Sequence, residues 1–321
     1  MSHFSSQRRR LVQGAVTAIT LPSLASFSAL AQGAPRELRI GHQKGLLSLL
    51  KGRGTLEKRL APLGVTVKWT EFTAGPVQLE ALNVGSIDFG DVGEAPPIFA
   101  QAAGAPLAYV GATVPRPASE AVLVPKGSAI KTVADLKGKK IALNKGSNVH
   151  YFLVKLLEKH GLTYTDVNPV FLPPSDARAA FEKGSVDAWV IWDPFLAAAE
   201  KALDATVLAD ATGVVGNRAY YFSSLGYVDK NADVLKVVIE ELDKVDQWGA
   251  ANRSALAAEL SQLFGIPRPV LELSVSRQKF GTTPITKAIL GEQQKIADTF
   301  FDLKLIPKRI NVLEAAAAGL A

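Results

Sequence analysis

The stretch ALNVGSIDFG at residues 81–90 has a counterpart in AFEKGSVDAW at residues 180–189. Both read as a helix end, a Gly-Ser turn, and an aliphatic residue followed by aspartate at the start of a strand. Each strand runs into a helix start marked by proline, in VGEAPP at 92–97 and IWDPF at 191–195. The repeat predicts two similar α/β lobes; a chance match between two common helix-turn-strand units is the alternative.

From residue 36 onward the chain alternates short apolar runs with helical patterns, as α/β domains do. The runs ELRIG, VTVKWTEF, IDFGDVG, LAYVGAT and EAVLVP predict strands, and KIALN, NPVFLP, DAWVIW and ATVLAD repeat the pattern in the second half. Helices are expected near 55–60 and 76–83. In open sheets ligands bind beyond the carboxyl ends of the strands, so two facing lobes predict one cleft between them.

The composition is that of a globular chain long enough for two domains, with 321 residues, 48% hydrophobic and 21% charged. Of the 36 basic residues, three lie in a segment expected to be removed, which leaves 33 against 30 acidic residues. No basic run is interleaved with aromatics, so nucleic acid is not an expected partner. The absence of cysteine excludes disulfides, a thiol nucleophile and a lipid attached to cysteine.

Residues 1–31 carry the marks of an export signal. A basic start at Arg8–Arg10 precedes a modestly apolar middle and a run of small residues, so cleavage is expected near Gln32. The paired arginines resemble a twin-arginine signal, and a general secretory signal has a similar layout. A membrane anchor is the alternative, but polar residues, glycine and proline interrupt the apolar stretch. We therefore expect a soluble protein outside the cytoplasm.

The stretch NKGSNVHYFLVKLLE at 144–158 predicts a helix whose start lacks an acidic residue. Its apolar residues at helical spacing are Val149, Phe152, Leu153, Leu156 and Leu157. Gly161 is a stop signal just past the end. Because the first turn holds no acid, its free N–H groups suit a bound anion. The starts at Gly75-Pro76 and 93–96 are alike, and caps that simply face water are the alternative.

Five segments of the chain carry a family resemblance: RIGHQKG, EFTAGPVQLEALNVGSIDFGDVGEAPPIFAQAAGA, IKTVADLKGKKIALNKGSN, SDARAAFEKGSVDAWVIWDPF and LIPKRINV. They closely resemble the periplasmic aliphatic sulfonate-binding proteins of ABC importers. ADLKGKK is shared by many two-lobed binding proteins, whereas AGPVQLEALNVGSID together with VDAWVIWDP is specific to the sulfonate, nitrate and taurine branch. The resemblance spans about residues 36 to 312.

The resemblance implies the α/β clamshell of a type II periplasmic binding protein, each lobe a mixed, mostly parallel sheet flanked by helices. Hinge crossings are implied near EAVLVP and RAYYFSS. Lobe one is then expected at 36–123 plus 220–321 and lobe two at 124–219. The implied function is capture of an aliphatic sulfonate in the cleft and its delivery to an ABC permease in the inner membrane for sulfur uptake, by a periplasmic monomer.

A sulfonate is a tetrahedral monoanion with three acceptor oxygens, so its site needs hydrogen-bond donors. Gln43 resembles the pocket glutamine of the family. Donors at the three helix starts are expected from Gly75, Gly93, Gly146, Ser147 and Asn148.

Trp192 offers a flat apolar face to the ligand's tail, with a core tryptophan as the alternative. Asp193 either faces the ligand's far end or a donor across the cleft, or caps the next helix. Glu94 either contacts the ligand or neutralises a helix start. His42 replaces an aromatic hydroxyl residue that is common in the family, which leaves the polarity of the accepted tail open.

The chain carries no Gly-x-Ser-x-Gly, His-Glu-x-x-His or Gly-x-x-x-x-Gly-Lys motif and no paired-ligand spacing for a metal. A protein without enzymatic activity, cofactor or metal is therefore expected. The rival of another class is an enzyme that acts on an anionic substrate with Asp193 and either His42 or His150. The rivals among binding proteins are binders of nitrate, taurine or a pyrimidine precursor.

Overall fold

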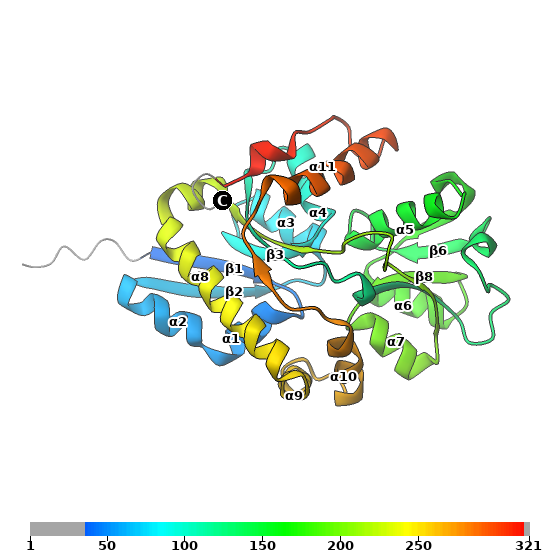
Figure 1. Cartoon of the computed structure of the whole chain (residues 1–321), viewed down its shortest axis with the longest axis horizontal. Coiled ribbons are helices and arrows are strands. Elements are labelled where there is room, and N and C mark those ends of the chain that lie inside the picture. The colour runs from blue at the N-terminus through cyan, green and yellow to red at the C-terminus, as the bar shows by residue number, and fades with distance from the viewer. Residues whose placement is uncertain (1–35, 318–321) are drawn as a thin grey trace, which may run out of the picture. The chain divides into compact units, whose positions relative to one another are not determined.

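The computed structural model of the chain describes residues 36–317, so the export signal predicted at 1–31 lies outside the described part. The described residues form two mixed β-sheets, each with helices on both faces (Figure 1). The prediction of an α/β fold with two sheets is confirmed.

The first sheet has six strands in the order β11-β4-β10-β3-β1-β2. They are β1 (Arg36–His42), β2 (Val65–Glu71), β3 (Phe89–Gly93), β4 (Leu107–Thr113), β10 (Ala219–Ser224) and β11 (Thr282–Thr283). β1 pairs in parallel with β2 and β3, and β10 lies antiparallel between β3 and β4. Two strands from the second half of the chain, β10 and β11, thus complete a sheet whose other four strands come from the first half.

Apolar clusters cover both faces of this sheet. One face packs against α1 (Leu46–Arg53), α2 (Thr55–Leu60), α8 (Leu225–Ala251), α9 (Arg253–Phe264) and α10 (Arg268–Arg277). The other packs against α3 (Gly75–Asn83), α4 (Pro96–Ala102) and α11 (Lys287–Asp302). The helices predicted near 55–60 and 76–83 correspond to α2 and α3.

The second sheet has five strands in the order β7-β6-β8-β5-β9. They are β5 (Glu120–Val124), β6 (Lys140–Leu143), β7 (Asn168–Phe171), β8 (Ala188–Trp192) and β9 (Thr206–Asp210). β5 lies antiparallel between β8 and β9, and β6 pairs in parallel with β7 and β8. Helix α5 (Asn148–Lys159) packs on one face, and α6 (Pro174–Glu182) and α7 (Phe195–Leu203) pack on the other.

Helix α5 follows its sequence pattern closely. The five apolar residues predicted at helical spacing are each at most 1% exposed. The helix ends at Lys159, two residues before Gly161, whose φ of 74° suits glycine.

The repeated sequence of the two halves corresponds to the same hydrogen-bond pattern in both sheets. In the first sheet, Asp88 N–H donates to the Arg39 carbonyl (2.7 Å), and Arg39 N–H donates to the Asp88 carboxylate (2.9 Å). In the second, Asp187 N–H donates to the Lys140 carbonyl (2.8 Å), and Lys140 N–H donates to the Asp187 carboxylate (2.7 Å). Each aspartate therefore fixes the register of two parallel strands, which a chance match of residues does not explain.

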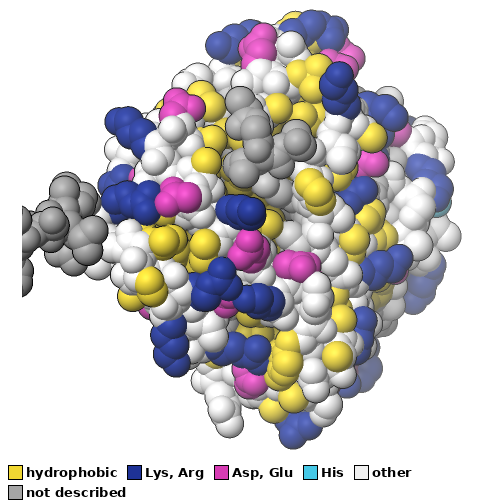
Figure 2. Space-filling model, turned by 60° about the vertical axis from the view of Figure 1, so that its left-hand side comes forward, with side chains coloured by type: hydrophobic (Ala, Val, Ile, Leu, Met, Phe, Trp, Pro, Cys, Tyr) yellow, Lys and Arg dark blue, Asp and Glu magenta, His cyan; other side chains and the backbone are white. Residues whose placement is uncertain are grey.

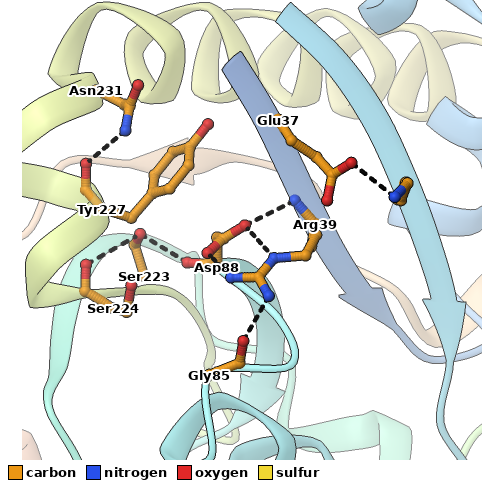
Figure 3. Close-up of polar contacts among 9 residues, drawn as sticks. Glu37, Arg39, Gly85, Asp88, Ser223, Ser224, Tyr227 and Asn231 are labelled. Atoms are coloured by element: carbon orange, nitrogen blue, oxygen red, sulfur yellow. Dashed lines mark hydrogen bonds and ion pairs between the residues drawn. The ribbon is translucent and has the colours of Figure 1, made fainter. Parts of the chain in front are cut away.

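Asp88 does more than its counterpart, because it also pairs with the Arg39 guanidinium at 2.6 Å and is buried. Figure 3 shows this pair beside Ser223 of β10, whose hydroxyl donates to the Asp88 carbonyl at 2.7 Å. Strands β1, β3 and β10 are thus joined by one polar cluster. Asp187 is exposed.

The chain passes between the two sheets through residues 114–119 and 211–218. By strand membership, EAVLVP at 120–125 already belongs to the second sheet, and β10 within RAYYFSS belongs to the first. The lobe boundaries expected at 123/124 and 219/220 stay a proposal. Both crossings border the polar pocket described below.

The surface shown in Figure 2 mixes basic, acidic and apolar side chains instead of concentrating one sign of charge. Among residues 36–317, no helix combines the length and the apolar character that crossing a membrane requires.

Candidate functional site

A polar pocket lies between the two sheets. It is bordered by the segments that follow β1, β3, β6 and β8 and by both crossings. In open sheets, ligands usually bind at these carboxyl ends of the strands. Its cavity volume is about 130 Å³. Since one water needs roughly 10–15 Å³ by this measure, the pocket has room for a small organic anion.

Seven of the nine predicted site residues line this pocket: Gln43, Gly75, Gly93, Ser147, Asn148, Trp192 and Asp193. Gly146 and Glu94 are absent from its lining. That these two residues contact a ligand stays a prediction, and the hydrogen bonds that each makes within the protein are described below.

The start of α5 offers fewer donors than its sequence predicts. Gly146 N–H donates to His150 Nδ1 at 3.2 Å, and both the N–H (3.3 Å) and the hydroxyl (2.7 Å) of Ser147 donate to the Asn144 carbonyl. The N–H groups of Asn148 and Val149 have no partner within residues 36–317. With no acid in this turn, these two N–H groups are the ones available to an anion.

The other two helix starts differ from each other. Gly75 N–H at the start of α3 has no partner among the described residues, and a Cβ there would lie 2.8 Å from Pro96, so glycine is required. The start of α4 carries Pro96 and Pro97, which have no N–H to offer. The first residues of α5 and α3 therefore keep N–H donors, whereas those of α4 itself have none.

His150 supports the start of α5 from behind. Its Nδ1 accepts from Gly146, so Nε2 carries the proton and donates to the Tyr164 hydroxyl at 2.8 Å. The ring is fully buried and packs against Phe99 and Phe300 of the first lobe. Burial, together with Lys145, lowers the pKa of His150 to about 4, so the ring is neutral at neutral pH.

Asn148 connects the lobes at the edge of the pocket. Its amide donates to the Glu120 carboxylate and to the Asn217 side-chain oxygen (3.2 Å). A Cβ on Gly93 of the other lobe would lie 3.0 Å from the Asn148 Cβ, so glycine allows this approach. Asn148 therefore holds the start of α5 against β5, the crossing at 211–218 and the first sheet.

Two buried carboxyl groups lie behind this contact. Glu94 accepts from Arg218 N–H at 3.2 Å, and one oxygen each of Glu94 and Glu120 is buried without a partner in the described chain. Burial raises the pKa of Glu94 to about 7, and burial and the nearby Glu94 raise the pKa of Glu120 well above its ordinary value. Glu94 thus sits inside the protein and neither lines the pocket nor faces outward.

The pocket also contains charged residues that the sequence reading missed. Arg116 lines it and makes no side-chain hydrogen bond or ion pair within residues 36–317, whereas Arg218 is held by Glu292 (2.9 Å) and the Thr113 carbonyl (2.9 Å). Half-buried Asp91 lines the same pocket, and its Oδ1 is buried without a partner among the described residues. Burial raises the pKa of Asp91 to about 6, although Arg116 opposes the shift. Both arginines lie in crossing segments, whose position at the cleft is the signal that identifies them.

Asp193 makes both kinds of contact that its sequence left open. Its carboxylate accepts from Ala197 N–H in the first turn of α7 (3.0 Å), and it pairs across the cleft with Arg277 of α10 (3.3 Å). Burial raises the pKa of Asp193 to about 6, with Arg277 opposing. Beside it, Trp192 lines the pocket and meets Phe195 edge to face, with ring centroids 6.1 Å apart.

His42 does not line the polar pocket with the charged residues. His42 is buried, its Nδ1 is 2.9 Å from the Ser48 hydroxyl, and it is absent from the pocket lining. No group of three or more His, Asp or Glu residues suited to a metal occurs in the described part of the chain.

Two facing α/β lobes around one polar pocket with helix-start donors define the class of type II periplasmic solute-binding proteins. The family model described as NMT1/THI5 like matches residues 63–252. A putative aliphatic sulfonates-binding protein of Escherichia coli (strain K12) is 42% identical over 91% of this chain and 92% of its own length. The chain belongs to this family of aliphatic sulfonates-binding proteins.

Solved structures agree with this relationship. The alkanesulfonate-binding protein SsuA from Xanthomonas axonopodis pv. citri bound to MOPS has a TM-score of 0.83 and 42% identity, covering 88% of this chain and 99% of that one. The desulfurization enzyme DSZB has a TM-score of 0.65 but 14% identity, covering 89% of this chain and 97% of that chain. The second likeness concerns the fold alone.

Proposed function

We propose that the chain captures aliphatic sulfonates in the interlobe pocket and passes them to an ABC permease for sulfur uptake. The observation that carries the proposal is the start of α5, where the N–H groups of Asn148 and Val149 have no partner in the described part of the chain and no acid lies in the first turn. Gly75 N–H and the Arg116 side chain, likewise without partners among residues 36–317, add donors around the same pocket.

A binding role accounts for the pocket better than catalysis. Asp193 is engaged by Arg277 and Ala197, and the rival catalytic base His42 does not line the pocket. His150 has both ring nitrogens engaged. The proposal therefore assigns no bond-making step to these residues, and it places the mature protein in the periplasm as a monomer without cofactor.

The test is a thermal-shift panel on protein that has been unfolded, freed of ligand and refolded. A ligand that binds only the folded state at one hundred times its Kd adds about 2.7 kcal/mol of stability. Methanesulfonate, butanesulfonate, taurine, nitrate and a pyrimidine precursor form the panel. A shift with nitrate or the pyrimidine precursor alone reassigns the ligand, and a new product detected by mass spectrometry reassigns the protein to an enzyme.

A further inference from the structure

A second cavity adjoins the polar pocket, and we call it the apolar cavity after the leucines and phenylalanine that form one of its walls. It lies between the loop after β1, helices α9 and α10, and the start of α7. Its apolar wall consists of Leu46, Leu256, Leu260, Phe264 and Leu271, and the small side chain of Ser274 completes it. No function considered so far uses this cavity.

The two cavities share part of their walls. Lys44, Gly45, Leu46, Asp193 and Gln278 line both of them. The charged ends of the shared residues have partners of opposite charge: Lys44 Nζ lies 3.9 Å from Glu71 Oε1, and Asp193 pairs with Arg277. Lys44 Nζ also lies over the Phe264 ring in the wall of the second cavity, 5.1 Å from its centre. A ligand in the polar pocket can therefore extend past these residues without meeting an unpaired charge.

We propose that the apolar cavity receives the far end of the ligand's alkyl chain. The inference rests on the proposed function, since a sulfonate head at α5 leaves its tail to find apolar surroundings. The polar pocket also has apolar residues, among them Leu46, Val92 and Trp192. In the second cavity, however, the apolar residues belong to one continuous cluster, made of Leu46, Leu256, Leu260, Phe264 and Leu271. The site would then select unbranched sulfonates with a chain of several carbons.

The size of the cavity sets how much tail it takes. Its volume is about 30 Å³, roughly the space of two waters, so it admits about two or three methylene groups. Each buried methylene is worth about 0.8 kcal/mol, which corresponds to about a fourfold gain in affinity. Affinity should therefore rise along the chain-length series only over the methylenes that enter the cavity and then level off.

The experiment measures Kd by isothermal titration for the linear series from methanesulfonate to octanesulfonate. We expect Ser274→Leu to fill the cavity and to remove the gain of longer chains while leaving methanesulfonate within about threefold of wild type, because Ser274 does not line the polar pocket. Ser276→Leu is the matched control, since Ser276 is exposed on the same helix. It should leave the whole series unchanged.

A second variant changes the cavity in the opposite direction. Leu260→Ala enlarges it, so the affinity plateau should move to longer chains, and this result stands even if Ser274→Leu melts early from overpacking. If the alkanesulfonates bind but their dependence of Kd on chain length is the same in both variants as in wild type, the inference is overturned. The alkyl tail would then bind elsewhere, for example against Trp192. Failure of methanesulfonate and butanesulfonate to bind the wild type overturns the proposed function itself.

Discussion

His150 does for α5 what an acidic residue often does at the third position of a helix. An acid there accepts from backbone N–H groups near the cap, but its charge would oppose a bound anion. A neutral imidazole accepts from Gly146 N–H without adding charge. This explains in physical terms how the first turn dispenses with an acid.

Substitutions of His150 separate this hydrogen bond from the packing of the ring. In His150→Asn the side-chain oxygen takes the place of Nδ1, so sulfonate affinity should stay within a few-fold although ring contacts are lost. In His150→Leu the bulk is kept, but Gly146 N–H is left buried and unpaired, at a cost of about 1–3 kcal/mol. We expect affinity to fall at least tenfold in the leucine variant. Titration calorimetry and melting curves test this, and affinities that simply follow the melting temperatures contradict it.

Ser147 allows a direct test of the anion at α5. At about 4 Å and an effective dielectric near 20, the carboxylate of Ser147→Asp repels a sulfonate by roughly 4 kcal/mol, or about a thousandfold in affinity. Because Ser147 donates its hydroxyl to the Asn144 carbonyl, the variant should also melt lower. Ser147→Asn is the uncharged control. If Ser147→Asp binds sulfonate within a few-fold of Ser147→Asn, the anion does not bind at this helix.

The hydrogen bonds that Ser147 donates to the Asn144 carbonyl could not be predicted from the sequence. Its pattern predicts a helix start and a cap residue, and both are present. Whether a hydroxyl or N–H group points at a ligand or at a neighbouring carbonyl depends on the path of the loop. That path is fixed by partners such as His150 and Tyr164, which have no fixed spacing from the cap that a sequence would reveal.

At the scale of elements, the repeated Gly-Ser-aliphatic-Asp unit was the most informative part of the sequence. It predicts a strand entry in each half, and the two aspartates hold equivalent strand pairs, β1 with β3 and β6 with β8. The pairing of β10 with β3 and β4 could not be predicted in this way. It joins segments more than a hundred residues apart, so no local pattern encodes it.

The two aspartates should differ in their contribution to stability. Asp88→Ala removes a buried partner of both the Arg39 N–H and its guanidinium, and should cost about 2–3 kcal/mol. Asp187→Ala removes a single exposed hydrogen bond from Lys140 N–H and should cost about 1 kcal/mol or less. Urea unfolding of the two variants provides the comparison, and equal losses would mean that the ion pair adds nothing.

For the whole molecule, the sequence predicts two lobes and a cleft, but not how the acids at the cleft are arranged. The crossing of the chain brings Glu120 of β5 near Glu94, which precedes α4. It also places Arg116 near Asp91 of β3 and Arg218 near Glu94. The raised pKa values of these acids mean that the folded protein holds protons more tightly than the unfolded chain.

This arrangement predicts how stability depends on pH. A carboxyl group whose folded pKa is raised contributes stability that is fully present below its unfolded pKa and is lost as pH rises through its folded pKa. With pKa values of about 6 for Asp91 and about 7 for Glu94, these two acids should remove stability from the unliganded protein between about pH 4.5 and 7. The lowered pKa of His150 acts in the opposite direction between about pH 4 and 6.5. Urea unfolding at a series of pH values tests this. Glu94→Gln should flatten the curve, and an unchanged slope would exclude Glu94 as its source.

The same acids predict that sulfonate binding takes up protons. An alkanesulfonate stays charged at every pH of interest, so any pH dependence of its affinity belongs to the protein. A bound anion near Asp91 and Glu94 raises their pKa values further, because like charges disfavour ionisation, and the complex therefore holds more protons than the free protein. Above about pH 6, affinity should fall as pH rises, by about tenfold for each pKa unit added by the ligand.

Titration calorimetry at pH 7 in phosphate and in Tris counts these protons, because the two buffers release them with different enthalpies. We expect different apparent binding enthalpies in wild type, a smaller difference in Glu94→Gln, and a Kd that is weaker at pH 8 than at pH 6. Arg116 and Arg218 act in the opposite direction, since they attract the anion at every pH and favour ionised acids. Equal enthalpies in both buffers, with equal Kd at both pH values, would mean that these cations fully compensate the acids and that the ligand does not sense Asp91 or Glu94.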